Sequence, residues 1–451
     1  MSLPTVPDVK AARLSACQYT ERFADAGNPL TPAQALVEAE RCLYCHDAPC
    51  TTACPTSIDV PSFIHRIADG NVRGAAKAIL EANPLGGMCA RVCPTEELCE
   101  QACVRNTELG KPVEIGRLQR FAVDKTLAAG GAPLFTRGPS TGKHIAVVGA
   151  GPAGLACAHV LARLGHDVTI FDAHEKAGGL NEYGLATYKT AGDFAQREVD
   201  WLLSIGGITI QTGWKLTTAA QLEELKAKYA AVFLGVGMGA VNALGVPGEA
   251  LEGVRSAVDF IAELRQTKDL SSLPIGRRVV VIGGGMTAVD AAVQAKLLGA
   301  EEVTMAYRRG PEAMSASKVE QEWAQTNGVS LRHWLAPVAI EGVDGHVTGV
   351  RFARQVIEGG KVVAAQDEVV VPADMVFKAI GQKLEVQPWP DAGIELQAGR
   401  IVVSDTGRTT LPGVWAGGDC VAGGRDLTVE AVDHGKRAAL SMHAELTATL
   451  A

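Results

Sequence analysis

The sequence predicts an α/β fold in which an N-terminal helical domain is followed by two domains built on parallel sheets. Three observations predict this. Residues 144–172 and 278–309 each read as strand, glycine-rich turn, helix and strand, the pattern of parallel strands joined by crossover helices. Eight of the 11 cysteines lie between Cys42 and Cys103. Around those cysteines, apolar residues recur three and four positions apart, as in short amphipathic helices.

Length and composition limit the class of protein. The 451 residues are enough for about three domains of about 150 residues. Hydrophobic residues make up 47% and charged residues 20%, which predicts a large core. The formal net charge of −8 argues against a nucleic-acid partner, since phosphate contacts need a basic face. The N-terminus lacks a secretory pattern and no apolar run approaches the about 20 residues of a membrane span. We therefore expect a cytoplasmic protein with no membrane partner.

Composition shifts predict where the domains divide. Thr31 before Pro32 is the expected start of an early helix, and residues 128–143, rich in Gly, Pro and Ser, read as a linker. The predicted division is 1–138 for the helical domain, 139–252 for the first part of one nucleotide domain, 253–384 for a second nucleotide domain, and 385–451 for the rest of the first.

The first glycine turn has the spacing of a dinucleotide site. Gly149, Gly151 and Gly154 follow a strand and open a helix. The first glycine permits the turn, the second lets a pyrophosphate approach the backbone, and the third permits close helix–strand packing. Asp172 ends the next strand, where an acid accepts a ribose hydroxyl or is only a solvated turn residue. The pattern predicts binding of FAD.

Two later glycine pairs are predicted to reach the same site. Gly178 and Gly179, followed by Leu180, give a flexible backbone soon after the second strand. Near the C-terminus, Gly418 and Asp419 precede a helix expected to begin near Thr428. The N-terminus of such a helix stabilises electron-rich flavin oxygens. Asp419 would bind a ribityl hydroxyl or the flavin phosphate, or would simply precede and cap the helix.

A second, less regular glycine turn predicts a nicotinamide site. Gly283, Gly285 and Met286 open this unit, and Ala288 stands where a third glycine is usual. A small residue there still permits close packing. Arg308 and Arg309 end the next strand, where an NAD site more often has an acid. A guanidinium suits the 2′-phosphate of NADP, although a solvated basic turn is the alternative, so the donor is NADPH or NADH with a leaning to NADPH.

The cysteines form two groups with the spacing of iron–sulfur ligands. The groups are Cys42, Cys45, Cys50 and Cys54 before Pro55, then Cys89, Cys93 before Pro94, Cys99 and Cys103. In bacterial ferredoxins the Cys that precedes Pro ligates the other cluster. On that rule one [4Fe–4S] cluster takes Cys42, Cys45, Cys50 and Cys103, and the other takes Cys54, Cys93 and Cys99. Zinc on four thiolates is the main alternative, and a disulfide framework is disfavoured because it belongs to small secreted domains.

With these motifs in view, the chain resembles the flavin/iron–sulfur half of dihydropyrimidine dehydrogenase, which in bacteria is a separate, NAD-dependent subunit. More distantly it is similar to the small subunit of glutamate synthase and to the large subunit of electron-bifurcating ferredoxin:NADP oxidoreductases. The stretches that carry the resemblance are ERCLYCHDAPCTTACP, NPLGGMCARVCPTEELCEQAC, IGRLQRFA and GGDCVAGG. The glycine motifs alone are shared with many disulfide-reductase-like flavoproteins, so the resemblance implies nucleotide domains of that Rossmann-like type.

The resemblance also implies residue roles. It implies Gln119 as the fourth ligand of the second cluster, where relatives outside the pyrimidine branch often carry glutamate, and it leaves Cys89 as a spare buried thiol. Lys189 matches a basic residue of the flavin loop, while Gly184-Leu185-Ala186 lacks the proline usual there. An amide oxygen in place of a thiolate should shift the potential of that cluster.

These inferences predict an electron-input subunit of a hetero-oligomer. NAD(P)H would reduce FAD, and two [4Fe–4S] clusters would pass single electrons to a partner that carries FMN and its own clusters and reduces uracil or thymine. No acid–base residue is expected, because the cofactors carry the chemistry. The rival enzyme is the glutamate synthase small subunit or another NAD(P)H–ferredoxin-type subunit. The rival of another class is a zinc-bearing, nucleotide-sensing scaffold.

Overall fold

The computed structural model describes residues 7–385 and 388–448. The chain folds into two compact units, each assembled from separate segments. Unit 1 takes the N-terminal residues to 26, residues 183–191 and residues 241–382. Unit 2 takes residues 27–182, 192–240 and those from 383 onward.

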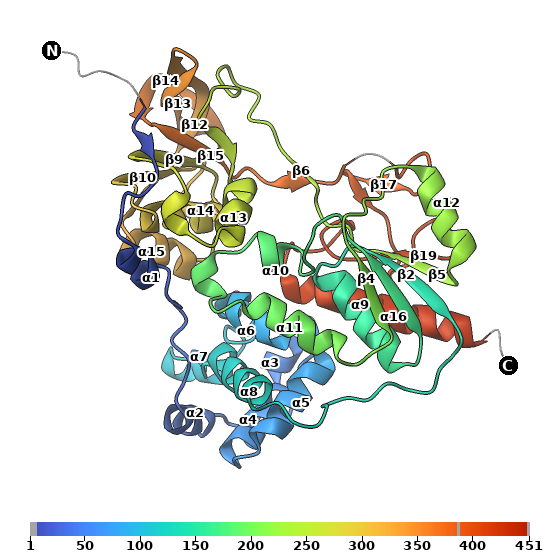
Figure 1. Ribbon diagram of the computed structural model, residues 1–451. Coiled ribbons are helices and arrows are strands. Elements are labelled where there is room, and N and C mark those ends of the chain that lie inside the picture. The colour runs from blue at the N-terminus through green and yellow to red at the C-terminus, as the bar shows by residue number, and fades with distance from the viewer. Residues whose placement is uncertain (1–6, 386–387, 449–451) are drawn as a thin grey trace. The chain divides into compact units, whose positions relative to one another are not determined.

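Unit 2 contains a five-stranded parallel sheet in the order β19-β5-β2-β3-β4 (Figure 1). Its strands are β2 (His144–Val148), β3 (Asp167–Phe171), β4 (Ile208–Gln211), β5 (Ala231–Leu234) and β19 (Val414–Ala416). Strand β2 is central and pairs with β3 from His144 opposite Asp167 to Val148 opposite Phe171. The glycine turn after β2 therefore lies at the carboxyl edge of the sheet, where such folds bind ligands.

Two helices pack closely on this sheet, α9 (Pro152–Arg163) and α16 (Thr428–Ala448), and lie side by side in Figure 1. Gly435 permits this approach, because a Cβ there would lie 2.0 Å from the carbonyl oxygen of Ala153. The other helices of this α/β part are α11 (Phe194–Leu203) and α12 (Ala219–Lys228), and a short hairpin joins β17 (Leu396–Gln397) to β18 (Arg400–Ile401).

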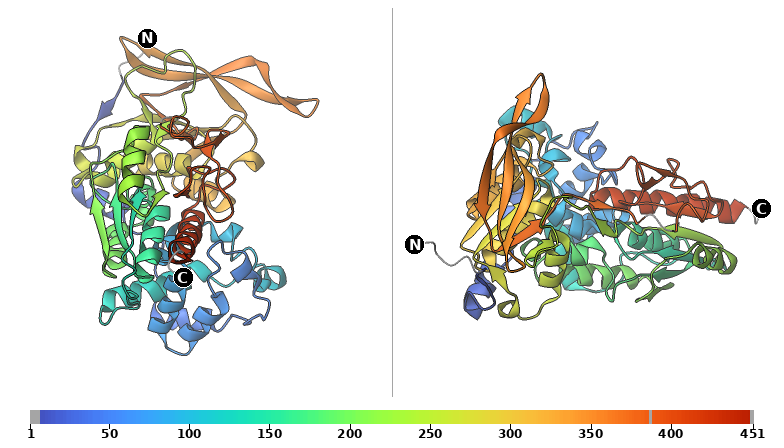
Figure 2. Two further views of the ribbon diagram at one scale, coloured as in Figure 1. Left: turned by 90° about the vertical axis from the view of Figure 1, so that its right-hand side faces the viewer. Right: turned by 90° about the horizontal axis from the view of Figure 1, so that it is seen from above.

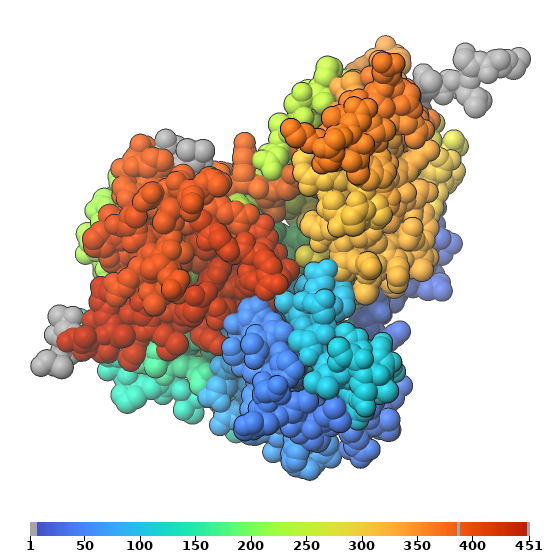
Figure 3. All heavy atoms as spheres, turned by 180° about the vertical axis from the view of Figure 1, so that it is seen from behind, coloured from blue at the N-terminus to red at the C-terminus, as the bar shows by residue number. Residues whose placement is uncertain are grey.

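The cysteine-rich part of unit 2 is helical. Its helices are α2 (Pro32–Ala39), α3 (Pro49–Thr52), α4 (Val60–Ala68), α5 (Val72–Ala82), α6 (Gly86–Val92), α7 (Val104–Leu109) and α8 (Ile115–Ala129). The predicted start of the first of these helices is confirmed: Thr31 is the N-cap of α2 and accepts a hydrogen bond from the backbone N–H of Gln34. Figure 3 shows these helices, in blue and cyan, meeting the C-terminal segment, in red.

Unit 1 repeats the parallel-sheet plan in the order β11-β10-β9-β15-β7. The strands are β7 (Val254–Ser256), β9 (Arg278–Ile282), β10 (Glu302–Ala306), β11 (Val329–Arg332) and β15 (Met375–Lys378), and the helices are α13 (Ala257–Gln266), α14 (Met286–Leu297) and α15 (Lys318–Thr326). The central strand β9 again leads into a glycine turn and a helix. The predicted α/β fold with two nucleotide-binding domains is thus confirmed.

A second sheet in unit 1 is antiparallel and has the order β12-β13-β14 (Figure 2). Its strands are β12 (Leu335–Val343), β13 (His346–Glu358) and β14 (Lys361–Pro372). Buried residues of this sheet, among them Val347, Val350 and Phe352, form one core with Val280 and Ile282 of β9. The antiparallel sheet therefore covers one face of the five-stranded sheet of unit 1.

Residues 7–26 fold with unit 1 rather than with the cysteine-rich helices. Strand β1 (Val9–Lys10) pairs antiparallel with β8 (Ile275–Gly276), and α1 (Ala16–Arg22) follows it. The remaining short α-helix and strands are α10 (Leu180–Tyr183), β6 (Ala240–Val241) and β16 (Gln382–Lys383).

The predicted four-part division of the chain, at residues 138, 252 and 384, stays a prediction. Within the described ranges, none of the helices has the length and apolar character of a membrane span.

Candidate cofactor sites

The glycine turn after β2 is shaped by close backbone packing. A Cβ on Gly149, whose φ is +102°, would lie 2.2 Å from the carbonyl oxygen of Gly235. A Cβ on Gly154 would lie 1.9 Å from the carbonyl oxygen of Gly149. Gly151, the N-cap of α9, has no such neighbour, since the closest atom to its Cβ is 3.8 Å away. The open space beside Gly151 and the free N–H groups of the helix start fit a pyrophosphate.

Asp172 holds this turn from the end of β3. Its Oδ2 accepts a hydrogen bond of 2.6 Å from the backbone N–H of Ala150, and its Oδ1 accepts one of 2.8 Å from the N–H of His174. The structure therefore places Asp172 at the glycine turn, as the motif predicts, and gives its carboxylate a structural task there. Contact with a ribose stays a prediction.

The later glycine pairs also lie at this turn. A Cβ on Gly179 would lie 2.7 Å from the Cα of Gly151, and one on Gly418 would lie 3.1 Å from the Cβ of Ala153. At the start of α16, Thr428 donates a 3.0 Å hydrogen bond to the side-chain oxygen of Asn181, next to the partly exposed Leu180. Burial raises the pKa of neighbouring Asp419 to about 6. Segments far apart in the sequence thus converge on one site.

The second glycine turn, in unit 1, has the same construction. A Cβ on Gly283 would lie 2.2 Å from the carbonyl oxygen of Ala379, and Gly285 is the N-cap of α14, which begins at Met286. Arg308 and Arg309 follow β10 and both are exposed. Their guanidinium groups are therefore accessible to a phosphate at the edge of the sheet that carries this turn.

The exposure of Arg309 gives a prediction about the hydride donor. If Arg309 binds the 2′-phosphate, Arg309→Ala should raise the KM for NADPH about tenfold or more, as loss of a charge-assisted bidentate contact does, and leave the KM for NADH nearly unchanged. Steady-state reduction of a soluble dye with each nucleotide measures both values. Equal use of NADPH by the variant and the parent protein would show that this arginine is a surface residue.

Lys189 has partners that its sequence context does not indicate. Its ammonium group lies 2.7 Å from a carboxylate oxygen of Asp290, on α14, and 2.7 Å from one of Glu320, on α15. Burial opposes the charge, but the two carboxylates outweigh burial and raise the pKa of Lys189. The lysine thus fixes residues 183–191 to unit 1, and its predicted contact with a cofactor stays a prediction.

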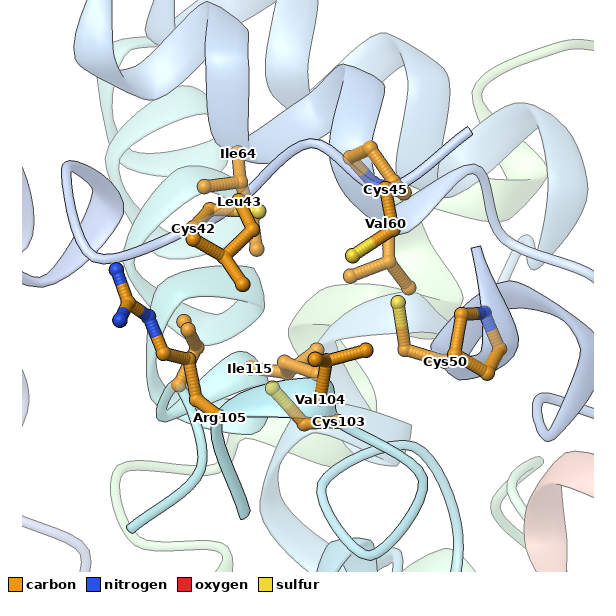
Figure 4. Close-up of a pocket in the computed structure, with 13 residues that line it drawn as sticks. Cys42, Leu43, Cys45, Cys50, Val60, Ile64, Cys103, Val104, Arg105 and Ile115 are labelled. Carbon is orange, nitrogen blue, oxygen red and sulfur yellow. The ribbon is translucent and has the colours of Figure 1, made fainter. Parts of the chain in front are cut away.

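Four thiols of the predicted first cluster line one cavity (Figure 4). Cys42 and Cys45 come from the loop before α3, Cys50 from α3, and Cys103 from the start of α7. Most of the other lining side chains are apolar, among them Leu43, Val60, Ile64, Val104 and Ile115, and the charged Arg105 also lines the cavity. Burial raises the pKa of Cys50 to about 11, so binding of iron, which needs thiolates, would release protons. Four convergent thiols in an apolar setting fit a cluster with four thiolate ligands.

The three predicted cysteine ligands of the second cluster also lie close together, and a fourth cysteine, Cys89, lies beside them. A hydrogen bond with Cys89, followed by burial and by the neighbouring Cys99 and Cys54, raises the pKa of Cys93. Cys89 itself is 3% exposed. The sequence sets this residue aside as a spare buried thiol, and the structure places it beside the ligand group. Its position four residues before Cys93, one helical turn away, is the signal that indicates this proximity.

Gln119, on α8, contacts α6, the helix that carries Cys89. Its side-chain nitrogen donates a 2.7 Å hydrogen bond to the carbonyl oxygen of Gly86, at the start of α6. Because the nitrogen is used in this way, the amide oxygen is the atom left to bind iron. Two residues, Gln119 and Cys89, are therefore candidates for the fourth ligand of the second cluster.

Replacing each candidate separately distinguishes them. We expect Cys89→Ala to keep the iron content and the EPR spectrum of the parent protein, and Gln119→Ala to lose about one iron or more per chain from the second cluster. Iron analysis and EPR after anaerobic purification measure this. Loss of iron only in Cys89→Ala would assign the fourth ligand to the thiol.

Glu198, on α11, is a buried acid that the sequence pattern does not indicate. Its carboxylate accepts hydrogen bonds of 2.6 Å from the N–H of Gly87 and 3.1 Å from the N–H of Met88, and the residue is 0% exposed. Glu198 thus caps α6, the helix that carries Cys89 and leads into Cys93. Burial raises the pKa of Glu198 to about 8. Nothing in the pattern around Glu198 distinguishes it from a solvated helix residue.

This pKa gives a pH dependence of stability. Between the ordinary value of 4.5 and about 8 the folded protein holds a proton on Glu198 that the unfolded chain has lost. The free energy of unfolding should therefore fall as the pH rises through that interval. Glu198→Gln keeps an oxygen for the two N–H groups but cannot titrate, so its melting temperature should fall less between about pH 5 and about pH 8. Parallel curves for the two proteins would refute the assignment.

Comparisons with known proteins agree with this arrangement. The profile described as pyridine nucleotide-disulphide oxidoreductase matches residues 143–435, and the one described as dihydropyrimidine dehydrogenase domain II, 4Fe-4S cluster, matches residues 19–130. The glutamate synthase [NADPH] small chain of Escherichia coli K12 is 36% identical, covering 96% of this chain and 95% of that protein. The NAD-dependent dihydropyrimidine dehydrogenase subunit PreT of Salmonella typhimurium LT2 is 35% identical, covering 92% and 94%.

Two solved structures share the fold. Mycobacterium tuberculosis FprA in complex with NADPH has a TM-score of 0.55 and 20% identity, over 68% of this chain and 86% of that chain. Thioredoxin reductase from T. acidophilum has a TM-score of 0.52 and 22% identity, over 67% and 99%. The matched domains imply FAD and NAD(P)H in the α/β part and 4Fe–4S clusters in the helical part, so the chain is an NAD(P)H-dependent flavin and iron–sulfur oxidoreductase. The chain belongs to the pyridine nucleotide-disulphide oxidoreductase family.

Proposed function

We propose that the chain is the electron-input subunit of a hetero-oligomeric dihydropyrimidine dehydrogenase in the cytoplasm, and that its partner reduces uracil or thymine. The observation that carries the electron-transfer part is the position of α16. The start of this helix lies at the first glycine turn, through Thr428 and Asn181, and Val429 packs in one apolar group with Cys89, Cys54 and Cys93. One helix turn thus connects the proposed flavin site with the proposed second cluster.

The residues of the chain bind and orient in this proposal. When bound, FAD accepts a hydride from NAD(P)H and the clusters carry its electrons onward one at a time. The glycine turn and the N-terminus of α9 hold the pyrophosphate, and Asp172 keeps that turn in shape. Cys42, Cys45, Cys50 and Cys103 would hold the first cluster, in a cavity lined mostly by apolar side chains.

The choice of a pyrimidine-reducing partner is supported by Gln119. A neutral amide at this position is the residue that the resemblance to dihydropyrimidine dehydrogenase implies, whereas relatives outside that branch often carry glutamate. The amide nitrogen of Gln119 donates to the carbonyl oxygen of Gly86, so the amide oxygen is the atom that we propose as the ligand. The glutamate synthase small subunit is the second candidate, because a protein of that name is similar over nearly the whole chain.

Anaerobic purification with the native partner tests the proposal. We expect a coloured complex whose absorbance and EPR spectra show flavin and iron–sulfur clusters that respond to added NAD(P)H, and which consumes uracil or thymine. A large glutaminase-bearing partner that forms glutamate would support the second candidate and contradict the first. Zinc without iron, sulfide or flavin would overturn the electron-transfer function itself and favour a nucleotide-sensing scaffold.

A further inference from the structure

We infer that Lys436, on α16, is an electrostatic partner of the second cluster, whose ammonium group raises the reduction potential of that cluster. No sequence motif marks Lys436. The inference rests on the proposed function, because it takes Cys54 to be a ligand of the second cluster.

The position of the ammonium group carries the first step. Its Nζ donates hydrogen bonds of 3.0 Å to the carbonyl oxygen of Thr56 and 2.9 Å to that of Ala82. Thr56 is 1% exposed, and its hydroxyl lies 3.3 Å from the sulfur of Cys54. Lys436 therefore reaches from the C-terminal helix into the turn that holds Cys54, and its charge lies beside that turn.

The ammonium group of Lys436 is bound by backbone carbonyls. In the described part of the chain its hydrogen-bond partners are the two backbone carbonyls, and Ala82 is the last residue of α5, where the helix dipole favours a cation. The nearest acid on α16, Asp433, pairs instead with Arg437 at 2.7 Å. Burial lowers the pKa of Lys436, and Asp433 and the Cys54 side chain oppose that effect. The positive charge of Lys436 therefore lies next to the turn that holds Cys54.

The effect on the cluster follows from charge. Reduction adds one electron to the cluster and changes no bond, so the cluster gains one negative charge. A cation close to the ligands stabilises the reduced form more than the oxidised form, and local charge and hydrogen bonds are what set cluster potentials. Lys436 would thereby make the second cluster a better acceptor for electrons leaving the flavin.

A redox titration of the full-length holoprotein, followed by EPR, tests this inference. In Lys436→Met, the ratio of reduced to oxidised second cluster at a fixed ambient potential should fall about tenfold, which is a shift of about 59 mV for one electron. The first cluster should be unchanged, and Lys436→Arg should restore the parent value. Arg437→Met is the matched control, because it removes an equal charge from the next position, where the charge is paired with Asp433.

Each outcome decides the inference. An unchanged potential in Lys436→Met, with both clusters present, would overturn it and leave the proposed function intact. If Lys436→Met and Lys436→Gln both fail to bind iron while Lys436→Arg binds it, the lysine is a structural residue and the inference is equally overturned. Parent protein without clusters would instead overturn the proposed function.

Discussion

Cys103→Ala is expected to lose about half of the bound iron, the four atoms of the first cluster, and to keep its flavin. Cys103 directly precedes α7 and is far in sequence from Cys42, Cys45 and Cys50, yet it lines the same cavity. Removing one of four thiolates leaves the cluster open to water and loss. Reduction of a soluble dye by NAD(P)H should persist, while electron delivery to the partner should stop. Iron analysis, EPR and the two activities measure this.

A second cysteine provides the control. Cys17 is exposed on α1 in unit 1, and Cys17→Ala should keep all of the iron and both activities. The variant and its control differ only in which thiol is lost. If Cys103→Ala retained the full iron content, the four-thiol cavity would not be a cluster site, and the assignment of ligands would need to begin from another set.

Gly151→Ala is expected to fold normally and to bind FAD about a hundredfold more weakly, a loss of about 2.8 kcal/mol. The added methyl group has room in the protein, since its nearest neighbour is 3.8 Å away, but it would occupy the space that a pyrophosphate uses. Flavin content after gel filtration and titration with FAD measure the affinity. Normal circular dichroism would show that the fold is intact.

Gly154→Ala is the comparison, three residues along the same helix. Its Cβ would lie 1.9 Å from the carbonyl oxygen of Gly149, so the helix and the turn would have to separate. We expect a lower melting temperature without FAD as well as loss of FAD, whereas Gly151→Ala should show only the second effect. Unimpaired FAD binding in Gly151→Ala would place the dinucleotide elsewhere.

The parts of this structure that a sequence motif marks were predictable, and the contacts that no motif marks were not. The turns at Gly149 and Gly283 were predictable because strand, turn and helix are contiguous in the sequence. The carbonyl oxygens that leave no room for a Cβ there belong to Gly235 and Ala379, which the motif does not indicate. The four thiols of the first cavity were predictable because cysteine spacing carries cluster chemistry. The partners of Glu198 and Lys189 were not, since they lie 111 and 131 positions away. Charged residues on amphipathic helices give no signal of such contacts.

The position of residues 7–26 in unit 1 could not be predicted either, for a different reason. Strand β1 consists of Val9 and Lys10 and pairs with a strand that begins at Ile275. Two residues are too few to show the alternation that predicts a strand. The sequence therefore groups these residues with the cysteine-rich region that follows them, although the chain folds them into the other unit.

Lys189 attaches residues 183–191 to the rest of unit 1. Unit 1 therefore cannot be produced from one continuous stretch of the gene. A fragment of residues 241–382 would lack both that segment and strand β1. Asp290, 2% exposed and bound by Lys189 and the N–H of Ala186, would then lose both of these partners. Transplanting this half between relatives, by recombination or design, therefore requires three separate stretches of chain to be exchanged together.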